Sequence, residues 1–371
     1  MKVMPVKSSH RTADDFVLRA ADALRAGKLV GLPTETVFGI AVSMTQASGI
    51  QALKDALGVQ GHPAWVIHVP SADCVAKFVS HVPPLARRLI RRLWPGPVSI
   101  QLPVDHSDVE RLTRRVGRQT TAEAMVDGCL TLRCTEIEIT RDIINSVGEP
   151  VTIVGATANQ RVDAAEDLPD SLSRQLSAIV AGPAPRYKSL STLVRITGHH
   201  LAVLREGAIA ERVIRRLEDM VIVFVCSGNT CRSPMAAGLA AQILSGKLHI
   251  PVDELPNQHV LVRSAGVHAA SGMPAAPEAV KVVGEMGADI HKHRSMPLTD
   301  DLLRRADMIY TMTQAHRDEI IAHAPLLSEK TFTLDPDGDI EDPIGKGEQV
   351  YRRTAQRLEK LIRYRLAELE L

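Results

Sequence analysis

Residues 221–236 read VIVFVCSGNTCRSPMA, and this stretch decides the fold of the C-terminal part of the chain. Its first five residues are all apolar, which is typical of a strand buried on both faces of a parallel sheet. Its end, Pro234 followed by Met-Ala-Ala, is typical of the first turn of a helix. Residues 226–233 therefore form a loop between the end of a strand and the start of a helix. This strand–loop–helix unit predicts an α/β domain.

Cys226 and Arg232 both lie on this loop, with five residues between them. A loop that curls at a helix N-terminus points several backbone N–H groups at one place and adds positive potential there, which suits a phosphate dianion. The same potential favours the thiolate form of Cys226. Arg232 can hold two phosphoryl oxygens with its planar fork. The pattern predicts a nucleophilic thiolate and a phosphate clamp around one oxyanion pocket.

The remaining loop residues are expected to bind the phosphate or to shape the loop. We expect Gly228 to adopt a backbone conformation closed to most residues. We expect Ser233 to donate its hydroxyl to the thiolate, and Asn229 to tie the loop together. The predicted substrate-binding residues are Ser227, Gly228, Asn229, Thr230, Cys231 and Ser233.

A carboxylate on a second loop completes the predicted site. Residues 340–345 read IEDPIG, in which Pro343 keeps Asp342 out of helical geometry and Gly345 allows a tight turn. We expect Asp342 to protonate the leaving group and then to deprotonate the water that hydrolyses a cysteinyl-phosphate. Asp335 also precedes a proline, but it lacks the turn and the following helix, so it ranks second.

Residues 220–371 resemble a low-molecular-weight protein phosphatase. The resemblance implies a doubly wound, four-stranded parallel sheet with helices on both faces, a phosphocysteine intermediate, a phosphorylated protein as substrate, and neither a metal nor another cofactor. It also implies that Cys231 is a second thiol that can form a disulfide with Cys226 and protect it from overoxidation. Beyond the loop, the matching motifs are Arg263-Ser264-Ala265-Gly266, His293-Arg294-Ser295, Leu298-Thr299 and Ala306-Asp307-Met308-Ile309.

Thr230 bears on the choice of substrate. Tyrosine-directed members of this family usually carry a larger aliphatic residue there, whereas Thr is similar to the bacterial protein-arginine phosphatases. Thr is shorter and brings a hydroxyl beside the phosphorus, which suits a polar guanidinium leaving group. Ile344 departs from the aromatic residue that both subclasses often place after the Asp-Pro pair. We favour phosphoarginine as the substrate, with phosphotyrosine as the alternative.

The N-terminal part of the chain alternates predicted helices and strands, which indicates a second α/β sheet. A charged helix over residues 210–219 is interpreted as a connector, so the predicted domains are residues 1–209 and 220–371. Helices are predicted over residues 14–27 and 85–93, and strands over residues 28–32, 65–69, 98–102, 151–154, 192–196 and 200–204.

Residues 12–209 resemble the YrdC-type threonylcarbamoyl-adenylate synthases. The resemblance implies a twisted mixed α/β sheet around a wide polar concavity that joins threonine, bicarbonate and ATP, with Mg, for tRNA modification. The matching segments are residues 31–39 (GLPTETVFG), 94–97 (WPGP), 133, 157–159 (TAN), 191–192 (ST) and 204–209 (LREGAI). The candidate ligand-binding residues are Thr34, Glu35, Thr36, Arg133, Thr157, Asn159, Ser191 and Arg205.

Positive charge is missing from part of this N-terminal pattern. A reaction that gathers two anions and a triphosphate needs fixed positive charge, which the family supplies largely from a Lys-x-Arg-Pro segment. Residues 56–63 read ALGVQGHP at that place, Lys54 lies too early, and Glu136 adds negative charge after Arg133. The domain is therefore either an active synthase with substituted charges or a catalytically degenerate module that binds a nucleotide, a small ligand or a protein partner. We favour the second.

Bulk composition sets the remaining limits. A chain of 371 residues is too long for one ordinary core, and its net charge of +1 gives no overall attraction to nucleic acid or to an anionic membrane. The sequence lacks a membrane-spanning apolar run, a secretory signal and the Cys/His spacing of a zinc site. Five scattered cysteines fit a reducing compartment. We expect a cytoplasmic protein with no membrane partner.

Overall fold

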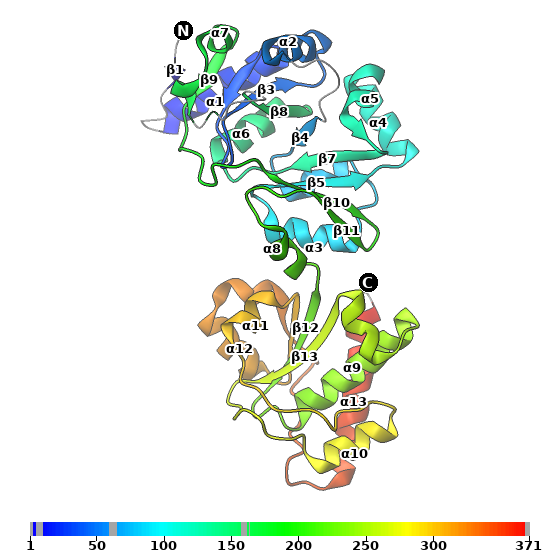
Figure 1. Cartoon of the computed structure of the whole chain (residues 1–371). Helices are drawn as coiled ribbons and strands as arrows, with labels where there is room; N and C mark the ends of the chain where they lie inside the picture. Colours follow the sequence, from blue (N-terminus) through cyan, green and yellow to red (C-terminus); the bar gives the residue numbers. More distant parts are fainter. Residues whose placement is uncertain (1–2, 5–9, 59–64, 157–161, 163, 368–371) are drawn as a thin grey trace. The chain divides into compact units, whose positions relative to one another are not determined.

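The computed structural model describes the chain except for residues 1–2, 5–9, 59–64, 157–161, 163 and 368–371 (Figure 1). Its contacts divide the chain into two units, Met1–Glu218 and Asp219–Leu371. The segment predicted as a connector belongs largely to the first unit. It forms the short helix α8 (Glu211–Arg216), because Ile214 is buried in the core of that unit. Among the described residues, no helix combines the length and apolar character needed to cross a membrane.

The first unit contains one mixed sheet, as predicted. Its strands pair in the order β1-β9-β2-β3-β8-β4-β7-β5-β10-β11, with β6 pairing with β7. The pairs β2–β3, β3–β8 and β5–β7 are antiparallel, whereas β4–β7 and β5–β10 are parallel. The strands are β1 (Val3–Met4), β2 (Val30–Leu32), β3 (Gly39–Ser43), β4 (Val66–His68), β5 (Val98–Pro103), β6 (Met125–Val126), β7 (Cys129–Arg133), β8 (Val151–Gly155), β9 (Ala178–Val180), β10 (Thr192–Thr197) and β11 (His200–Arg205).

Helices cover this sheet, and two apolar clusters fill the space around it. Leu24 of α1 and Ile143 of α6 meet Val30 and Ile153 of the sheet in one cluster, while Trp65 and Ile67 belong to the other. The helices are α1 (His10–Arg25), α2 (Ala47–Leu57), α3 (Pro84–Leu93), α4 (His106–Val116), α5 (Arg118–Ala124), α6 (Glu138–Val147), α7 (Asp170–Ser173) and α8, with short 3-10 turns η1 (Ala72–Lys77) and η2 (Ala165–Asp167).

The second unit contains a four-stranded sheet in which all pairs are parallel, which confirms the predicted architecture. The strand order is β13-β12-β14-β15, so the first strand of the unit lies in the interior of the sheet. The strands are β12 (Met220–Cys226), β13 (Val260–Gly266), β14 (Met308–Thr311) and β15 (Thr331–Thr333).

Helices pack on both faces of this sheet (Figure 1). Alternate residues of β12 serve the two faces, because side chains in a strand point alternately to opposite sides. Ile222 and Phe224 belong to the cluster with α9, α10 and α13, whereas Val221, Val223 and Val225 belong to the cluster with α11 and α12. The helices are α9 (Arg232–Leu248), α10 (Pro277–Glu285), α11 (Asp300–Arg305), α12 (Gln314–His323) and α13 (Glu348–Ala367), with turns η3 (Val252–Gln258) and η4 (Pro325–Lys330).

The strand order fixes where a ligand can bind in this unit. The chain leaves β12 and adds β13 on one side, then returns to add β14 on the other. In an open α/β sheet, the crevice outside the carboxyl ends of the strands at such a reversal is the usual ligand site. The loop that follows Cys226 lies at the carboxyl end of β12, and the sheet therefore presents this loop at the reversal point.

We predict that Phe224→Ala destabilises the second unit by about 3–5 kcal/mol, because Phe224 is fully buried and stacks on Tyr310 with ring centroids 5.7 Å apart. Phe332→Ala is the matched control, because Phe332 lies on the same sheet but is 40% exposed. Urea-dependent hydrogen exchange of the β12 amides measures both changes. Equal losses in the two variants would contradict the assignment of Phe224 to the core.

Candidate active site

The loop after β12 places two polar groups beside the sulfur of Cys226. The backbone N–H of Asn229 donates to Sγ at 3.3 Å, and the hydroxyl of Ser233 lies 3.0 Å from it. Ser233 belongs to the first turn of α9, so the helix N-terminus is directed at the same sulfur. These contacts favour negative charge on Sγ.

Asn229 links this loop to two other segments. Its side-chain amide donates to Ser233 Oγ and to Ser264 Oγ, each at 2.9 Å, and its Oδ1 accepts from the backbone N–H of Met296 at 2.9 Å. Its carbonyl oxygen lies 2.8 Å from Nε2 of His293, which donates to it. The fully buried Asn229 side chain therefore fixes the shape of the loop from inside.

The prediction for Gly228 was wrong. Gly228 does not have a positive φ; the left-handed residue is its neighbour Asn229, with φ of 55°. Asn tolerates this region better than most residues, and the bonds of its side chain hold it there. The glycine that this site requires is instead Gly266 at the end of β13, because the loop backbone packs directly against it. A Cβ at Gly266 would lie 2.4 Å from the carbonyl oxygen of Ser227 and 2.9 Å from the amide nitrogen of Asn229.

Arg232 and Asp342 are in direct contact. Nη2 of Arg232 donates to Oδ2 of Asp342 at 2.5 Å, and Nη1 donates to the carbonyl of Ile340 at 3.1 Å. Arg232 is 5% exposed, whereas the Asp342 side chain is 41% exposed. The predicted clamp and the predicted acid therefore meet, and the acid is on the solvent side. Asp335, the second-ranked acid, instead pairs with Arg357 of α13 at 2.6 Å.

Sequence reasoning missed His316, which lies beside the loop. Its Nε2 is 2.9 Å from Ser227 Oγ, and its Nδ1 is 2.8 Å from Thr313 Oγ1. Burial and the positive charge of Arg232 lower the pKa of His316 to about 4, so the imidazole is neutral near pH 7. The available signal was Thr-x-x-His directly after an apolar strand, in which Thr313 caps α12 by accepting from the backbone N–H of His316.

Cys231 has a different environment from Cys226. Its Sγ lies 3.2 Å from the hydroxyl of Tyr351 on α13 and 3.7 Å from the hydroxyl of Thr230. Burial raises the pKa of the Cys231 thiol, and burial together with this contact raises the pKa of Tyr351. Both loop cysteines are free thiols. The Cys231 thiol is therefore held in its protonated form.

Four of the candidate residues in the first unit form a buried cluster. Nη2 of Arg133, at the end of β7, donates to Glu35 Oε1 and to Thr36 Oγ1, each at 2.8 Å. The hydroxyls of Thr34 and Thr36 are 3.0 Å apart. The other carboxylate oxygen of Glu35 accepts from the hydroxyl of Thr135 and from the Glu136 amide. The charge of Arg133 is thus already neutralised by Glu35.

Ser191 and Arg205 form a second cluster. The guanidinium of Arg205 donates to the carbonyl of Ser191 at 3.0 Å and 3.2 Å, and Ser191 Oγ lies 2.9 Å from Ser99 Oγ. Burial and the nearby positive charge of Arg133 lower the pKa of Arg205. The two clusters therefore influence each other electrostatically. The remaining candidates, Thr157 and Asn159, lie outside the described residues.

Lys54 is engaged elsewhere in the same unit. Its Nζ lies 2.7 Å from Glu123 in a salt bridge that is almost fully buried, and Trp65 Nε1 donates to the same carboxylate at 3.3 Å. Residues 59–64 of the altered segment, which include His62, are outside the described part of the chain. Lys54 therefore does not serve as a replacement for the missing basic residues.

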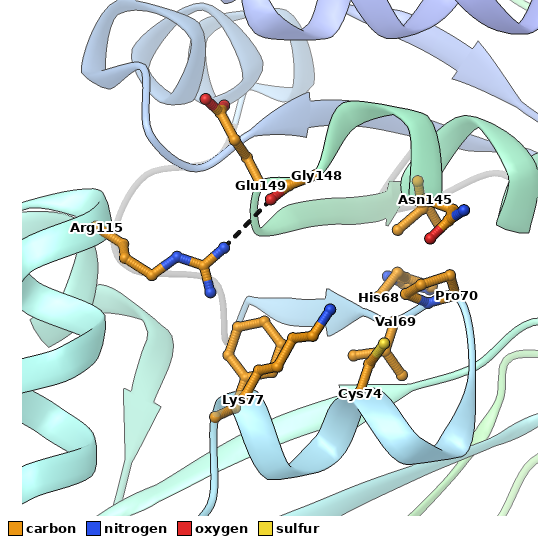
Figure 2. A pocket seen from close by; sticks show the side chains of 11 residues that line it. His68, Val69, Pro70, Cys74, Lys77, Arg115, Asn145, Gly148 and Glu149 are labelled. Atoms are coloured by element: carbon orange, nitrogen blue, oxygen red, sulfur yellow. Dashed lines mark hydrogen bonds between the residues drawn. The ribbon is translucent and has the colours of Figure 1, made fainter.

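A small polar pocket lies beside the end of β4 (Figure 2). Lys77 and Arg115 supply two cationic side chains, and Arg115 donates to the carbonyl of Gly148 at 3.4 Å. Burial and the charge of Arg133 lower the pKa of His68 to about 3, and His68 Nε2 has no hydrogen-bond partner. Glu149 and several apolar side chains also line this pocket, so its charge is mixed. Within the described residues, no cluster of His, Cys, Asp and Glu could hold a metal ion.

Comparison with known proteins assigns a family to each unit. The family model described as telomere recombination (Sua5, YciO and YrdC) matches residues 22–207, and the model for low molecular weight phosphotyrosine protein phosphatase matches residues 221–370. A threonylcarbamoyl-AMP synthase of Pyrococcus abyssi is 25% identical over 221 residues, which cover 58% of this chain and 62% of that relative.

Phosphatases of two named specificities resemble the second unit. A protein-arginine-phosphatase of Geobacillus stearothermophilus is 44% identical over 152 residues, which cover 40% of this chain and 93% of that relative. A probable low molecular weight protein-tyrosine-phosphatase of Ralstonia solanacearum is 42% identical over 127 residues, or 34% of this chain and 79% of that relative. The similarity extends over nearly the whole of the arginine-directed relative.

We predict that His316 makes the second unit less stable as the pH falls from about 6.5 to about 4. An unfolded histidine titrates near 6.5, so in this window the unfolded chain binds a proton that the folded chain does not, and stability falls by at most about 1.4 kcal/mol per pH unit. Urea unfolding at pH 7 and pH 5, monitored through hydrogen exchange of the β12 amides, measures the effect. His316→Gln should lose this part of the pH dependence. An unchanged dependence in that variant would contradict the prediction.

Proposed function

We propose that the C-terminal domain of this chain is a protein phosphatase, because the chain belongs to the low molecular weight phosphatase family over residues 221–370. Over residues 22–207 it belongs to the Sua5/YciO/YrdC family. The observation that carries the proposal is the meeting of three groups at one loop. The Cys226 sulfur accepts from the loop amide of Asn229, and Arg232, the first residue of α9 after this loop, contacts Asp342. A nucleophile, an oxyanion clamp and an acid are the parts that this reaction needs.

The reaction proceeds in two displacements at phosphorus. In the first, the Cys226 thiolate forms a sulfur–phosphorus bond while the bond to the leaving nitrogen or oxygen breaks, and Asp342 gives its proton to the leaving group. In the second, the Asp342 carboxylate takes a proton from water, the water oxygen attacks phosphorus, and the thiolate leaves. Arg232 holds two phosphoryl oxygens through both steps, and no metal or cofactor takes part.

We favour phosphoarginine over phosphotyrosine as the substrate. Thr230 is half-buried on the loop, and it is shorter and more polar than the aliphatic residue usual in tyrosine-directed members. Ile344, two residues after Asp342, is 64% exposed, so this part of the acid loop presents an aliphatic side chain where an aromatic wall for a phenol ring is usual. Both features suit a guanidinium leaving group. A phosphorylated protein of a reducing, cytoplasmic compartment is the proposed substrate.

For the N-terminal domain, we propose a ligand-binding module of the Sua5/YciO/YrdC type whose catalytic charges are degenerate. The supporting observation is that two of its basic side chains are already paired with carboxylates. Arg133 is paired with the buried carboxylate of Glu35, and Lys54 is paired with Glu123. A triphosphate would have to displace these carboxylates, which costs free energy because each would be left buried without its partner. The alternative is an active synthase that uses ATP, Mg and threonine for tRNA modification.

A turnover panel tests the phosphatase. We expect the full chain to release phosphate faster from a phosphoarginine peptide than from the matched phosphotyrosine peptide, and Cys226→Ser to abolish both activities. Thr230→Ile should shift the ratio toward phosphotyrosine by about tenfold or more, because it removes the hydroxyl beside the phosphorus and narrows the slot. Equal phosphoarginine rates in the wild type and Thr230→Ile would overturn the role of Thr230.

Calorimetric titration tests the N-terminal domain. With ATP, Mg, threonine and bicarbonate, we expect no formation of threonylcarbamoyl-AMP and ATP binding no tighter than about millimolar, because Arg133 is already paired with a buried carboxylate and a phosphate would have to break that pair. Arg133→Ala is the control, since any binding in this site should change with it. Turnover to threonylcarbamoyl-AMP would establish the synthase and remove the degenerate interpretation.

A further inference from the structure

We propose that His316 is a positioning residue of the phosphatase, which acts through Ser227 to hold the guanidinium of Arg232 in the orientation that clamps the phosphoryl group. The inference rests on the proposed phosphatase function and adds a part to it. Four residues form one continuous series of contacts, Arg232–Ser227–His316–Thr313, in which the distances from Arg232 Nη2 onward are 3.4 Å, 2.9 Å and 2.8 Å.

Ser227 supplies a contact that Arg232 can keep during catalysis. The guanidinium touches Ile340 O, Ser227 Oγ and Asp342 Oδ2. The contact with Asp342 has to change when that carboxyl group carries a proton for the leaving group and Arg232 turns to phosphoryl oxygens. The contacts to Ile340 and Ser227 do not depend on that proton. They define the plane of the fork, and bidentate binding of two oxygens requires a fixed plane.

The neutral state of His316 determines how hydrogen atoms are shared in this series. A neutral imidazole donates from one ring nitrogen and accepts at the other. If Ser227 donates its hydroxyl hydrogen to Nε2, then Nδ1–H donates to Thr313 Oγ1, and the Ser227 oxygen remains free to accept from Arg232. In the opposite arrangement, Nε2–H and Arg232 would both donate to the Ser227 oxygen, whose two lone pairs can accept both hydrogen bonds. Either arrangement gives each contact one donor and one acceptor, and in both of them Ser227 links the imidazole to the guanidinium.

The fold holds His316 firmly in this place. His316 is 7% exposed and lies in the first turn of α12, where Thr313 caps the helix by accepting from the His316 amide. Thr313 therefore binds both the backbone and the ring of His316. A protonated ring would place a second positive charge beside Arg232, which the burial of both groups disfavours. Nearby titratable groups on other elements are His268, Asp339 and Asp342.

A double-mutant cycle on the full chain tests the proposal, with kcat/KM on the phosphoarginine peptide and the inhibition constant of inorganic phosphate as the two readouts. His316→Leu and Ser227→Ala should each lower kcat/KM about tenfold and weaken phosphate inhibition about as much. The double variant should also lose about tenfold, rather than the roughly hundredfold that independent effects would give. His316→Gln should recover most of the loss, because its amide can accept from Ser227 at the position of Nε2.

His323→Leu is the matched control, since His323 lies on the same helix and is 64% exposed, with Asp300 as its partner at 2.8 Å. It should leave both readouts unchanged. Independent, additive losses, or a full rate in Ser227→Ala, would overturn the role of His316. If His316→Leu does not fold, Ser227→Ala and His316→Gln still decide the question, because the first should be impaired and the second should not. A wild-type chain that hydrolyses no phosphorylated substrate would refute the phosphatase itself, which is a different outcome.

Discussion

The structure of the second unit depends on concentrating positive potential around one sulfur atom. The amide of Asn229 and the first turn of α9 are directed at Cys226, and Arg232 lies on the same turn. Backbone amides that converge in this way cannot form ordinary secondary-structure bonds with each other, so the loop needs external support. Asn229 provides it through bonds to Ser233, Ser264 and the Met296 amide, and Gly266 provides the space. Much of the surrounding sheet serves to hold this concentration of donors in place.

The two units use a buried arginine in opposite ways. Arg133 is paired with Glu35, a carboxylate that is almost completely buried and accepts further bonds from Thr135 and Glu136. Arg232 is paired with Asp342, a carboxylate on an exposed loop. Breaking the first pair would leave both charges buried, whereas breaking the second leaves only the Arg232 guanidinium buried, because solvent can hydrate the Asp342 carboxylate. The first pair therefore behaves as part of the framework, and the second is able to exchange partners.

The sequence allowed prediction of those features that are encoded locally. The apolar run of β12, the proline at the start of α9 and the Asp-Pro turn each depend on neighbouring residues, and the parallel sheet and the mixed sheet were confirmed. Features that depend on distant contacts were missed. His316 lies 89 residues after Ser227, and the neutralisation of Lys54 depends on Glu123, which lies 69 residues further on. The error at Gly228 has a related cause, because the bonds of Asn229 come from segments 35 and 67 residues away and decide which residue takes the left-handed conformation.

The contact between Cys231 and Tyr351 spans 120 residues and has a consequence for synthesis of the chain. A ribosome that has completed the loop still has to translate Ser264, Met296, His316, Asp342 and finally Tyr351 before the loop gains all its supports. Until then, Cys231 lacks the burial that raises the pKa of its thiol and the Tyr351 hydroxyl that lies beside it. The shielding of the Cys231 thiol is therefore acquired late, only after α13 has emerged and packed.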